Sequence, residues 1–283
     1  MINTITILCC VCSLFVSLIL PVLILIFYSV KNKEKKTVSA WFLGAAGFFV
    51  TQILIRVPLL NLISALDGFA AFAQSHYWLY AFGLALTAGL FELAGRFAVA
   101  KIMAKNLTYE RALAAGLGHG GIEAIVLVGI TYINNLIYIF LINTGAFDVL
   151  IAQTAAAGAD TSQLVYIRDV LLDTPGYLYL LGGLERLLTM ICHAAMSMIV
   201  CFAVHKKRVL PGLLSCLSLH TLLDTTAGIS GLATDALGNR LSQTAAYTII
   251  YFPLTAFAVL SVLILRRIRI RWQNEVTPNG GTL

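Results

Sequence analysis

Residues 5–30 read ITILCCVCSLFVSLILPVLILIFYSV, and the charged stretch KNKEKK follows at 31–36. The apolar run contains no acidic or basic side chain, and a helix needs about 20 mostly apolar residues to cross a bilayer. A secretory signal has a shorter apolar region of about 7–15 residues behind a basic start, whereas the first lysine here is Lys31. We therefore expect residues 5–30 to be a retained membrane-spanning helix with the N-terminus outside.

The composition of the whole chain agrees with this interpretation. Of its 283 residues, 59% are hydrophobic and 11% are charged, and the mean hydropathy is +0.89. Soluble globular domains carry about 25% charged residues. The composition therefore excludes an ordinary soluble enzyme, a disordered chain and a nucleic-acid-binding module. It predicts an all-α polytopic membrane helix bundle with the lipid bilayer as its surroundings.

Seven membrane-spanning segments are expected from the apolar runs at 5–30, 39–56, 77–100, 112–142, 177–204, 209–228 and 244–265. The chain carries 19 Lys and Arg residues, and 14 of them gather in four clusters, at 31–36, 101–111, 206–208 and 266–271. Threading the spans alternately places all four clusters on one side, as the positive-inside rule requires. The C-terminus is then cytoplasmic. Residues 1–272 form one membrane domain, and 273–283 are expected to be a disordered tail.

The segment 143–176 is the only sizeable loop that this topology leaves. Its stretch 160–174 begins with a capping candidate, Asp160 or Thr161, and continues with apolar residues at helical spacing, which predicts a short surface helix. The six cysteines all lie in apolar runs. Cys9 and Cys12 form a lone CxxC without a partner pair, which favours an apolar filling role over a metal site or disulfide.

Ionisable residues inside the expected spans are the most informative feature of the sequence. They are Glu92, Arg96, His119, Glu123, Glu185, Arg186, His193, His220 and Asp224. Each charge costs about 2.5–3.5 kcal/mol at the bilayer centre, so such residues are by default candidates for function. We expect Glu185 and Arg186, in the outer third of their span, to serve packing or gating.

Five of these residues share one depth. These residues are Glu92, His119, Glu123, His193 and His220, and they come from four different spans. Counted from the basic flank of each span at about 1.5 Å per residue, they lie about 12–18 Å from the cytoplasmic side. Pairs four residues apart share one helix face, which applies to Glu92 with Arg96, His119 with Glu123, and His220 with Asp224. The glycines at 116, 118, 120 and 121 allow neighbouring helices to approach His119 closely.

A cluster of this kind is suited to metal-assisted hydrolysis. A catalytic zinc takes three His or carboxylate ligands and keeps one position for water. The ligands would be His193, His220 and either His119 or Glu123. Glu92 or the uncoordinated Glu123 would take the proton.

Two further residues have supporting roles in this scheme. Asp224 would orient His220 or a neighbour from the second layer around the metal. Arg96 would keep Glu92 ionised or stabilise a developing oxyanion.

The motifs FELAGR (91–96), GLGHGGIEA (116–124), Glu185-Arg186 followed by His193, and HTLLD (220–224) resemble the YhfC family of intramembrane metalloproteases and, more distantly, the PrsW and CAAX-protease clan. The resemblance implies a Glu-x-x-x-basic motif at Glu92 and Arg96, a second motif at His119 and Glu123, and later helices carrying His193 and His220 with Asp224. One departure is that clan members usually pair two glutamates where Glu92 is here followed by Leu93. Which carboxylate activates water therefore stays open.

The function expected on these grounds is an intramembrane metal-dependent endopeptidase, with Zn²⁺ as the cofactor and a membrane-embedded peptide or protein as the substrate. Its expected location is the bacterial plasma membrane, and no nucleic acid is expected as a partner. The alternatives are a proton- or cation-coupled transporter, which also uses buried Glu, Asp and His, and a non-catalytic peptide-binding or immunity protein. The absence of paired broken helices argues against the transporter.

Overall fold

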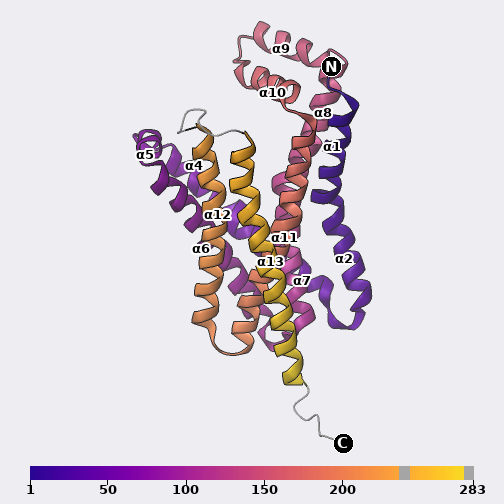
Figure 1. Cartoon of the computed structure of the whole chain (residues 1–283), viewed down its shortest axis with the longest axis vertical. Helices are drawn as coiled ribbons and strands as arrows, with labels where there is room; N and C mark the ends of the chain where they lie inside the picture. Colours follow the sequence, from indigo (N-terminus) through magenta and orange to yellow (C-terminus); the bar gives the residue numbers. More distant parts are fainter. Residues whose placement is uncertain (236–242, 277–283) are drawn as a thin grey trace, which may run out of the picture. The chain divides into compact units, whose positions relative to one another are not determined.

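The computed structural model describes residues 1–235 and 243–276, and these residues are helical apart from short connections, with no strand among them (Figure 1). The helices from the N-terminus to the middle of the chain are α1 (Thr4–Leu14), α2 (Leu20–Lys31), α3 (Thr37–Phe48), α4 (Val57–Ser64), α5 (Phe69–Ser75), α6 (Tyr77–Met103) and α7 (Tyr109–Glu123). Those that follow are α8 (Ile130–Asn143), α9 (Ala146–Ala156), α10 (Ser162–Asp173), α11 (Tyr179–His205), α12 (Val209–Asp235) and α13 (Gln243–Val276).

Three π-helical segments join α-helices without breaking them. They are η1 (Phe15–Ile19), η3 (Phe49–Arg56) and η5 (Ala124–Gly129). Three short 3₁₀ segments complete the secondary structure of the described chain: η2 (Lys33–Lys35), η4 (Ala104–Asn106) and η6 (Gly176–Leu178). A π-helical turn widens the helix and changes which side chains face a neighbour, and such turns are frequent at functional sites.

Among the described residues, six helices are long and apolar enough to span a membrane, at Thr4–Lys31, Thr37–Ser64, Tyr77–Asn106, Tyr109–Asn143, Gly176–His205 and Tyr247–Asn274. Six of the seven expected spans coincide with them, so the all-α membrane bundle is confirmed. The seventh, 209–228, lies in α12, which has 27 residues but is not among the six. Its polar side chains, His220 and Asp224 among them, lower its hydropathy. The count of seven and the orientation of the termini stay predictions.

The segment 143–176 contains two helices rather than one. The expected surface helix is present as α10, where Asp160 accepts hydrogen bonds from the backbone and the hydroxyl of Ser162 at 2.9 and 2.7 Å. The other, α9, follows Gly145, whose φ of 78° ends the preceding helix. At the C-terminus, α13 continues through 273–276, so these residues of the expected tail are helical, and 277–283 lie outside the described residues.

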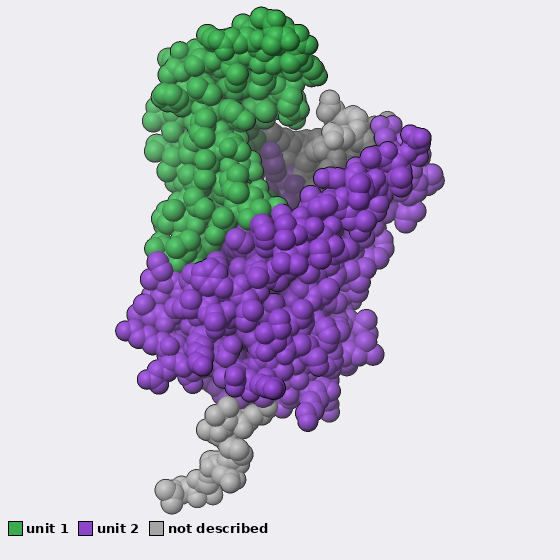
Figure 2. Space-filling view, turned by 180° about the vertical axis from the view of Figure 1, so that it is seen from behind, with its two compact units in different colours: residues 1–23, 124–187 green, residues 24–123, 188–283 purple. Residues whose placement is uncertain are grey.

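The chain divides into two compact units (Figure 2). Unit 1 comprises Met1–Leu23 and Ala124–Leu187, and unit 2 comprises Ile24–Glu123 and Leu188–Leu283. In unit 1, α1 packs against α8, and the hydroxyls of Ser13 and Tyr132 both donate to the carbonyl of Tyr179. Cys9 and Cys10 are buried in the apolar core of this unit, whereas Cys12 is exposed.

Unit 2 is held together by very close helix contacts at glycines of α7. A Cβ on Gly118 would overlap the backbone oxygen of Trp41 on α3, so these two backbones touch. On another face of α7, a Cβ on Gly116 would lie 2.9 Å from Cα of Ala194 on α11. Lipid offers little hydrophobic drive for helix association, so close packing of small residues must supply it. The glycine-rich stretch around His119 therefore does bring neighbouring helices close, as the sequence predicts.

Gly118→Ala tests this packing. The added methyl group has no space against a backbone oxygen, so we expect a loss of about 1–3 kcal/mol in unfolding free energy and a thermal midpoint several degrees lower. The matched control is Gly83→Ala on α6, where a Cβ meets no atom within 4 Å and the better helix propensity of alanine leaves stability equal or higher. Equal midpoints for Gly118→Ala and wild type would contradict the close contact.

Candidate functional site

The ionisable residues expected at one depth meet in the interior of unit 2. Glu92 and Arg96 come from α6, His119 and Glu123 from α7, His193 from α11, and His220 and Asp224 from α12. All except Asp224 are buried. The ring centroid of His193 lies 5.5 Å from that of His119 and 5.6 Å from that of His220. The convergence predicted from depth and facing is thus present.

Glu92 lies at the centre of the cluster. Its Oε2 lies 3.0 Å from Nε2 of His119 and accepts a hydrogen bond from Nη2 of Arg96 at 3.0 Å. The same oxygen lies 3.6 Å from Nδ1 of both His193 and His220. One carboxylate oxygen therefore contacts side chains from four helices.

Arg96 connects the histidines to this carboxylate. Nη2 of its guanidinium lies 2.6 Å from Nδ1 of His193, and Nη1 lies 3.5 Å from Nδ1 of His220. A guanidinium can only donate hydrogen bonds, so Nδ1 of His193 is the acceptor. The hydrogen of the neutral imidazole then resides on Nε2, which lies 2.8 Å from Oε2 of Glu123.

Four residues form a possible metal site. Glu92, His119, Glu123 and His193 each offer one ligand atom, and the four atoms lie within 4.8 Å of one another. Two imidazoles and two carboxylates are a donor set that zinc accepts, at Zn–N and Zn–O distances of about 2.0–2.2 Å. The residues present therefore fit a divalent metal.

His220 is not in this group, although its depth and helix face predict a ligand at this position. Its Nε2 faces Asp224 Oδ2 at 3.2 Å, and its Nδ1 faces Glu92 and Arg96. Depth and helix face placed His220 in the cluster correctly, but they do not determine toward which neighbour the ring points. The contact with Asp224 agrees with the orienting role expected for that carboxylate. Glu185 and Arg186, in unit 1, form an ion pair with each other.

The site also contains two residues that were not expected there, Gln52 and Arg56 of η3. Gln52 is buried and its Nε2 donates to Oε1 of Glu92 at 2.9 Å. Arg56 donates to Gln52 Oε1 at 3.4 Å and to the carbonyl of Leu84 at 2.8 Å, which turns the amide nitrogen toward Glu92. Both oxygens of Glu92 are therefore held by side chains. The signal available in the sequence was that Gln52 and Arg56 are polar, lie in an apolar run and are four residues apart, so that they share one helix face.

A small cavity of about 10 Å³ adjoins the cluster, lined by Arg96, His119, Ser197 and apolar neighbours. Nε of Arg96 and the hydroxyl of Ser197 are buried and have no hydrogen-bond partner in the described part of the chain. A polar cavity of this volume is about the size that one water molecule requires.

Comparison with known proteins identifies the family. The chain matches the family described as YhfC intramembrane metalloprotease over residues 16–238. The chain belongs to the YhfC family. It is 32% identical over 213 residues to a protein of Bacillus subtilis (strain 168) named "Uncharacterized membrane protein YhfC", covering 75% of this chain and 80% of that protein. No solved structure matches it. The resemblance in the sequence motifs is confirmed, and all the buried site residues lie within the matched range of this YhfC-family chain.

The ligand group predicts which variants lose metal. After dialysis against zinc at saturating concentration, we expect His119→Asn and His193→Asn to retain little metal, because each removes a ligand nitrogen. His220→Asn should still bind about one ion per chain, although loss of an orienting contact lowers affinity by about 10–100-fold. Mass spectrometry of metal content provides the measurement. Equal loss in His220→Asn and His193→Asn would return His220 to the ligand set.

Gln52→Leu tests the support of Glu92. The substitution removes the hydrogen bond to Oε1, so the carboxylate loses its fixed orientation and metal affinity should fall about 10–100-fold. Thr51→Val is the neighbouring control, since its hydroxyl bonds only to the carbonyl of Gly47 on the same helix. A zinc titration followed by calorimetry measures both variants. Identical affinities for Gln52→Leu and Thr51→Val would refute this role.

Proposed function

We propose that this protein is an intramembrane metal-dependent endopeptidase that uses zinc. One observation carries the proposal: ligand atoms from α6, α7 and α11 converge within 4.8 Å at buried positions of helices that are apolar enough to span a membrane. Buried ionisable groups are expensive in such surroundings and are retained for function. The name of the family to which the chain belongs also supports the proposal.

We assign His119, His193 and Glu92 as the residues that hold the metal. Ligating carboxylates are themselves commonly held by hydrogen bonds, and Glu92 meets this condition through Gln52 and Arg96. A metal bound there would polarise the scissile carbonyl and activate a water molecule. Zinc suits this set because it accepts histidine nitrogens and carboxylate oxygens, and catalytic zinc sites commonly combine three protein ligands with a water molecule.

The remaining residues of the site then have separate roles. Glu123 accepts the proton of the attacking water, since its carboxylate lies within the ligand group and next to His193. Arg96 offers buried N–H donors that stabilise the negative charge developing on the substrate oxygen. Asp224 holds Nε2 of His220, so that the other ring nitrogen keeps facing Glu92 and Arg96.

The substrate class follows from the position of the site. Its residues lie in the middle of long apolar helices, so a peptide must be membrane-embedded or membrane-anchored to reach them. A helical substrate must unwind locally, because its amides are otherwise hydrogen-bonded within the helix. We place the protein in a bacterial plasma membrane, in line with the origin of its relative.

Matched glutamine variants test the mechanism. In proteoliposomes containing a single-span reporter peptide, we expect Glu123→Gln to lower the cleavage rate by about 10²–10⁴-fold, the usual contribution of a general base, while keeping its zinc. Glu92→Gln should lose both zinc and cleavage. A chelator should stop cleavage by the wild type, and added zinc should restore it. Full cleavage by Glu123→Gln would contradict the assignment, and loss of zinc in that variant alone would exchange the two carboxylate roles.

The same proteoliposomes distinguish the transporter. A proton flux that persists in Glu123→Gln without any cleavage by the wild type would favour ion transport over hydrolysis. Peptide binding without either cleavage or flux would favour a non-catalytic binding protein.

A further inference from the structure

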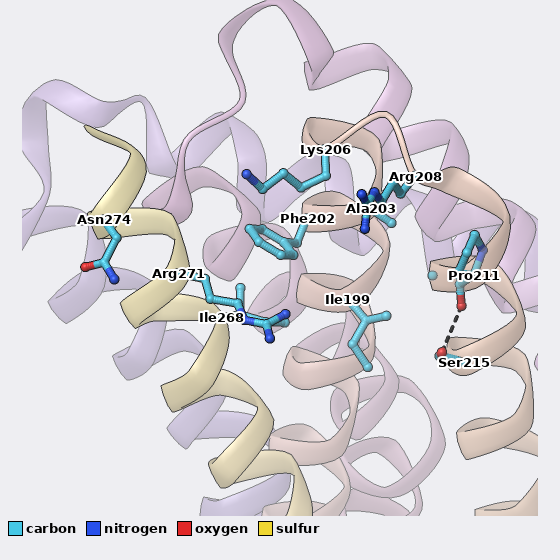
Figure 3. A pocket seen from close by; sticks show the side chains of 11 residues that line it. Ile199, Phe202, Ala203, Lys206, Arg208, Pro211, Ser215, Ile268, Arg271 and Asn274 are labelled. Atoms are coloured by element: carbon cyan, nitrogen blue, oxygen red, sulfur yellow. Dashed lines mark hydrogen bonds between the residues drawn. The ribbon is translucent and has the colours of Figure 1, made fainter. Parts of the chain in front are cut away.

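A second, larger cavity lies in unit 2 at one end of α11, α12 and α13. Its volume is about 740 Å³, within the range of about 300–1,000 Å³ typical of ligand pockets. It lies beside the tight turn between α11 and α12 and against the last turns of α13 (Figure 3). None of the residues assigned to the metal site lines it, so the catalytic proposal does not explain it.

The polar lining of this pocket is cationic. Lys206, Arg208 and Arg271 line it, and no Asp or Glu is among its eleven lining residues. Figure 3 shows Arg271 reaching from α13 toward α11, while Lys206 extends from the end of α11 toward α13. All three side chains are exposed. Three positive charges converge on one space, so the pocket complements an anion.

The rest of the lining is apolar. Ile199, Phe202 and Ala203 of α11 line the pocket together with Pro211 of α12 and Ile268 of α13. The pocket thus combines a basic rim with an apolar interior. Inorganic phosphate would make no use of the apolar part, whereas a phospholipid has an anionic headgroup and acyl chains that use both.

The surroundings indicate how acyl chains would continue from the pocket. On α12, Leu210 and Leu214 are exposed and lie next in sequence to the lining residues Pro211 and Ser215. On α13, the exposed Ile270 precedes Arg271. The charges stand at the basic end of membrane-spanning helices, where basic pockets between helices commonly receive lipid headgroups.

We propose that this pocket binds the headgroup of an anionic phospholipid, with Lys206, Arg208 and Arg271 contacting the phosphate and the apolar lining contacting the first acyl carbons. The site is separate from the metal cluster. Ile199 follows His193 by six residues on α11, and Ser215 precedes His220 by five residues on α12, so the pocket begins about 8–9 Å along these helices from the histidines.

The test is lipid competition on the full-length protein. The protein is reconstituted in nanodiscs with equal amounts of phosphatidylglycerol and phosphatidylcholine, and the retained lipids are counted by native mass spectrometry. We expect wild type to retain phosphatidylglycerol selectively. Arg208→Gln/Arg271→Gln should lower this selectivity about 30-fold, since each basic side chain near an anionic surface contributes a factor of about five.

The matched control is Arg266→Gln/Arg267→Gln, which removes the same charge from exposed positions of α13 outside the pocket lining and should keep the selectivity of wild type. Should the double pocket variant fail to fold, each single variant carries the test with an expected fivefold loss.

Equal losses in the pocket and control pairs would overturn the site in favour of diffuse charge attraction. Displacement of the lipid by millimolar inorganic phosphate would overturn the lipid as the occupant. Because binding is measured without proteolysis, the result does not depend on the proposed enzymatic activity.

Discussion

The buried contact between Arg96 and its three partners is the interaction on which the site of this YhfC-family protein depends. A guanidinium taken out of water costs several kcal/mol unless it is paired and hydrogen-bonded. Arg96 meets this condition through Glu92 on its own helix, His193 on α11 and, at longer distance, His220 on α12. Removing a partner would leave a buried charge uncompensated, at about 3–5 kcal/mol. The contacts of Arg96 therefore join α6 to α11 and α12 at the cluster.

The same contact determines the state of His193. Since Arg96 can only donate, Nδ1 accepts, and Nε2 carries the hydrogen toward Glu123. A nitrogen that binds a metal must be free of its hydrogen, and metal binding commonly releases a proton. Ligation through Nε2 of His193 would place a hydrogen on Nδ1 and remove the acceptor of Arg96. Metal loading and the pairing of Arg96 are thus coupled, and the hydrogen bond to Glu92 Oε2 at 3.0 Å is the contact that the guanidinium would keep.

Much of this site could be predicted from the sequence, for a physical reason. Charged residues in apolar helices must find partners, and a regular rise per residue fixes their depth, so Glu92, His119 and His193 could be expected to meet. Which ring nitrogen faces which neighbour depends on side-chain rotamers and helix rotation. Depth therefore predicted His220 as a ligand but not the direction of its ring, which lies between Asp224 and Arg96.

The fold was predictable to a similar degree. Apolar runs locate the long helices because length and hydropathy are properties of the local sequence. The π-helical segment η3 leaves no such signature in the sequence. The usual α-helical period therefore could not predict that the side chain of Gln52 faces Glu92. A search for ionisable groups also passes over a glutamine. The second helix of the loop, α9, was missed because its composition resembles that of a buried segment.

The two helices that carry His193 and His220, α11 and α12, also line the basic pocket. A short turn connects them directly. Only residues 206–208 separate α11 from α12, and Lys207 adopts a φ of 55°, a backbone conformation that is uncommon for residues other than glycine. Next to this turn, a Cβ on Gly212 would overlap Cβ of Ala203, so α11 and α12 lie in direct contact there. An occupant held between α13 and this hairpin would therefore act on α11 and α12 together. The basic pocket and the histidines of the metal cluster thus share the same two helices, α11 and α12.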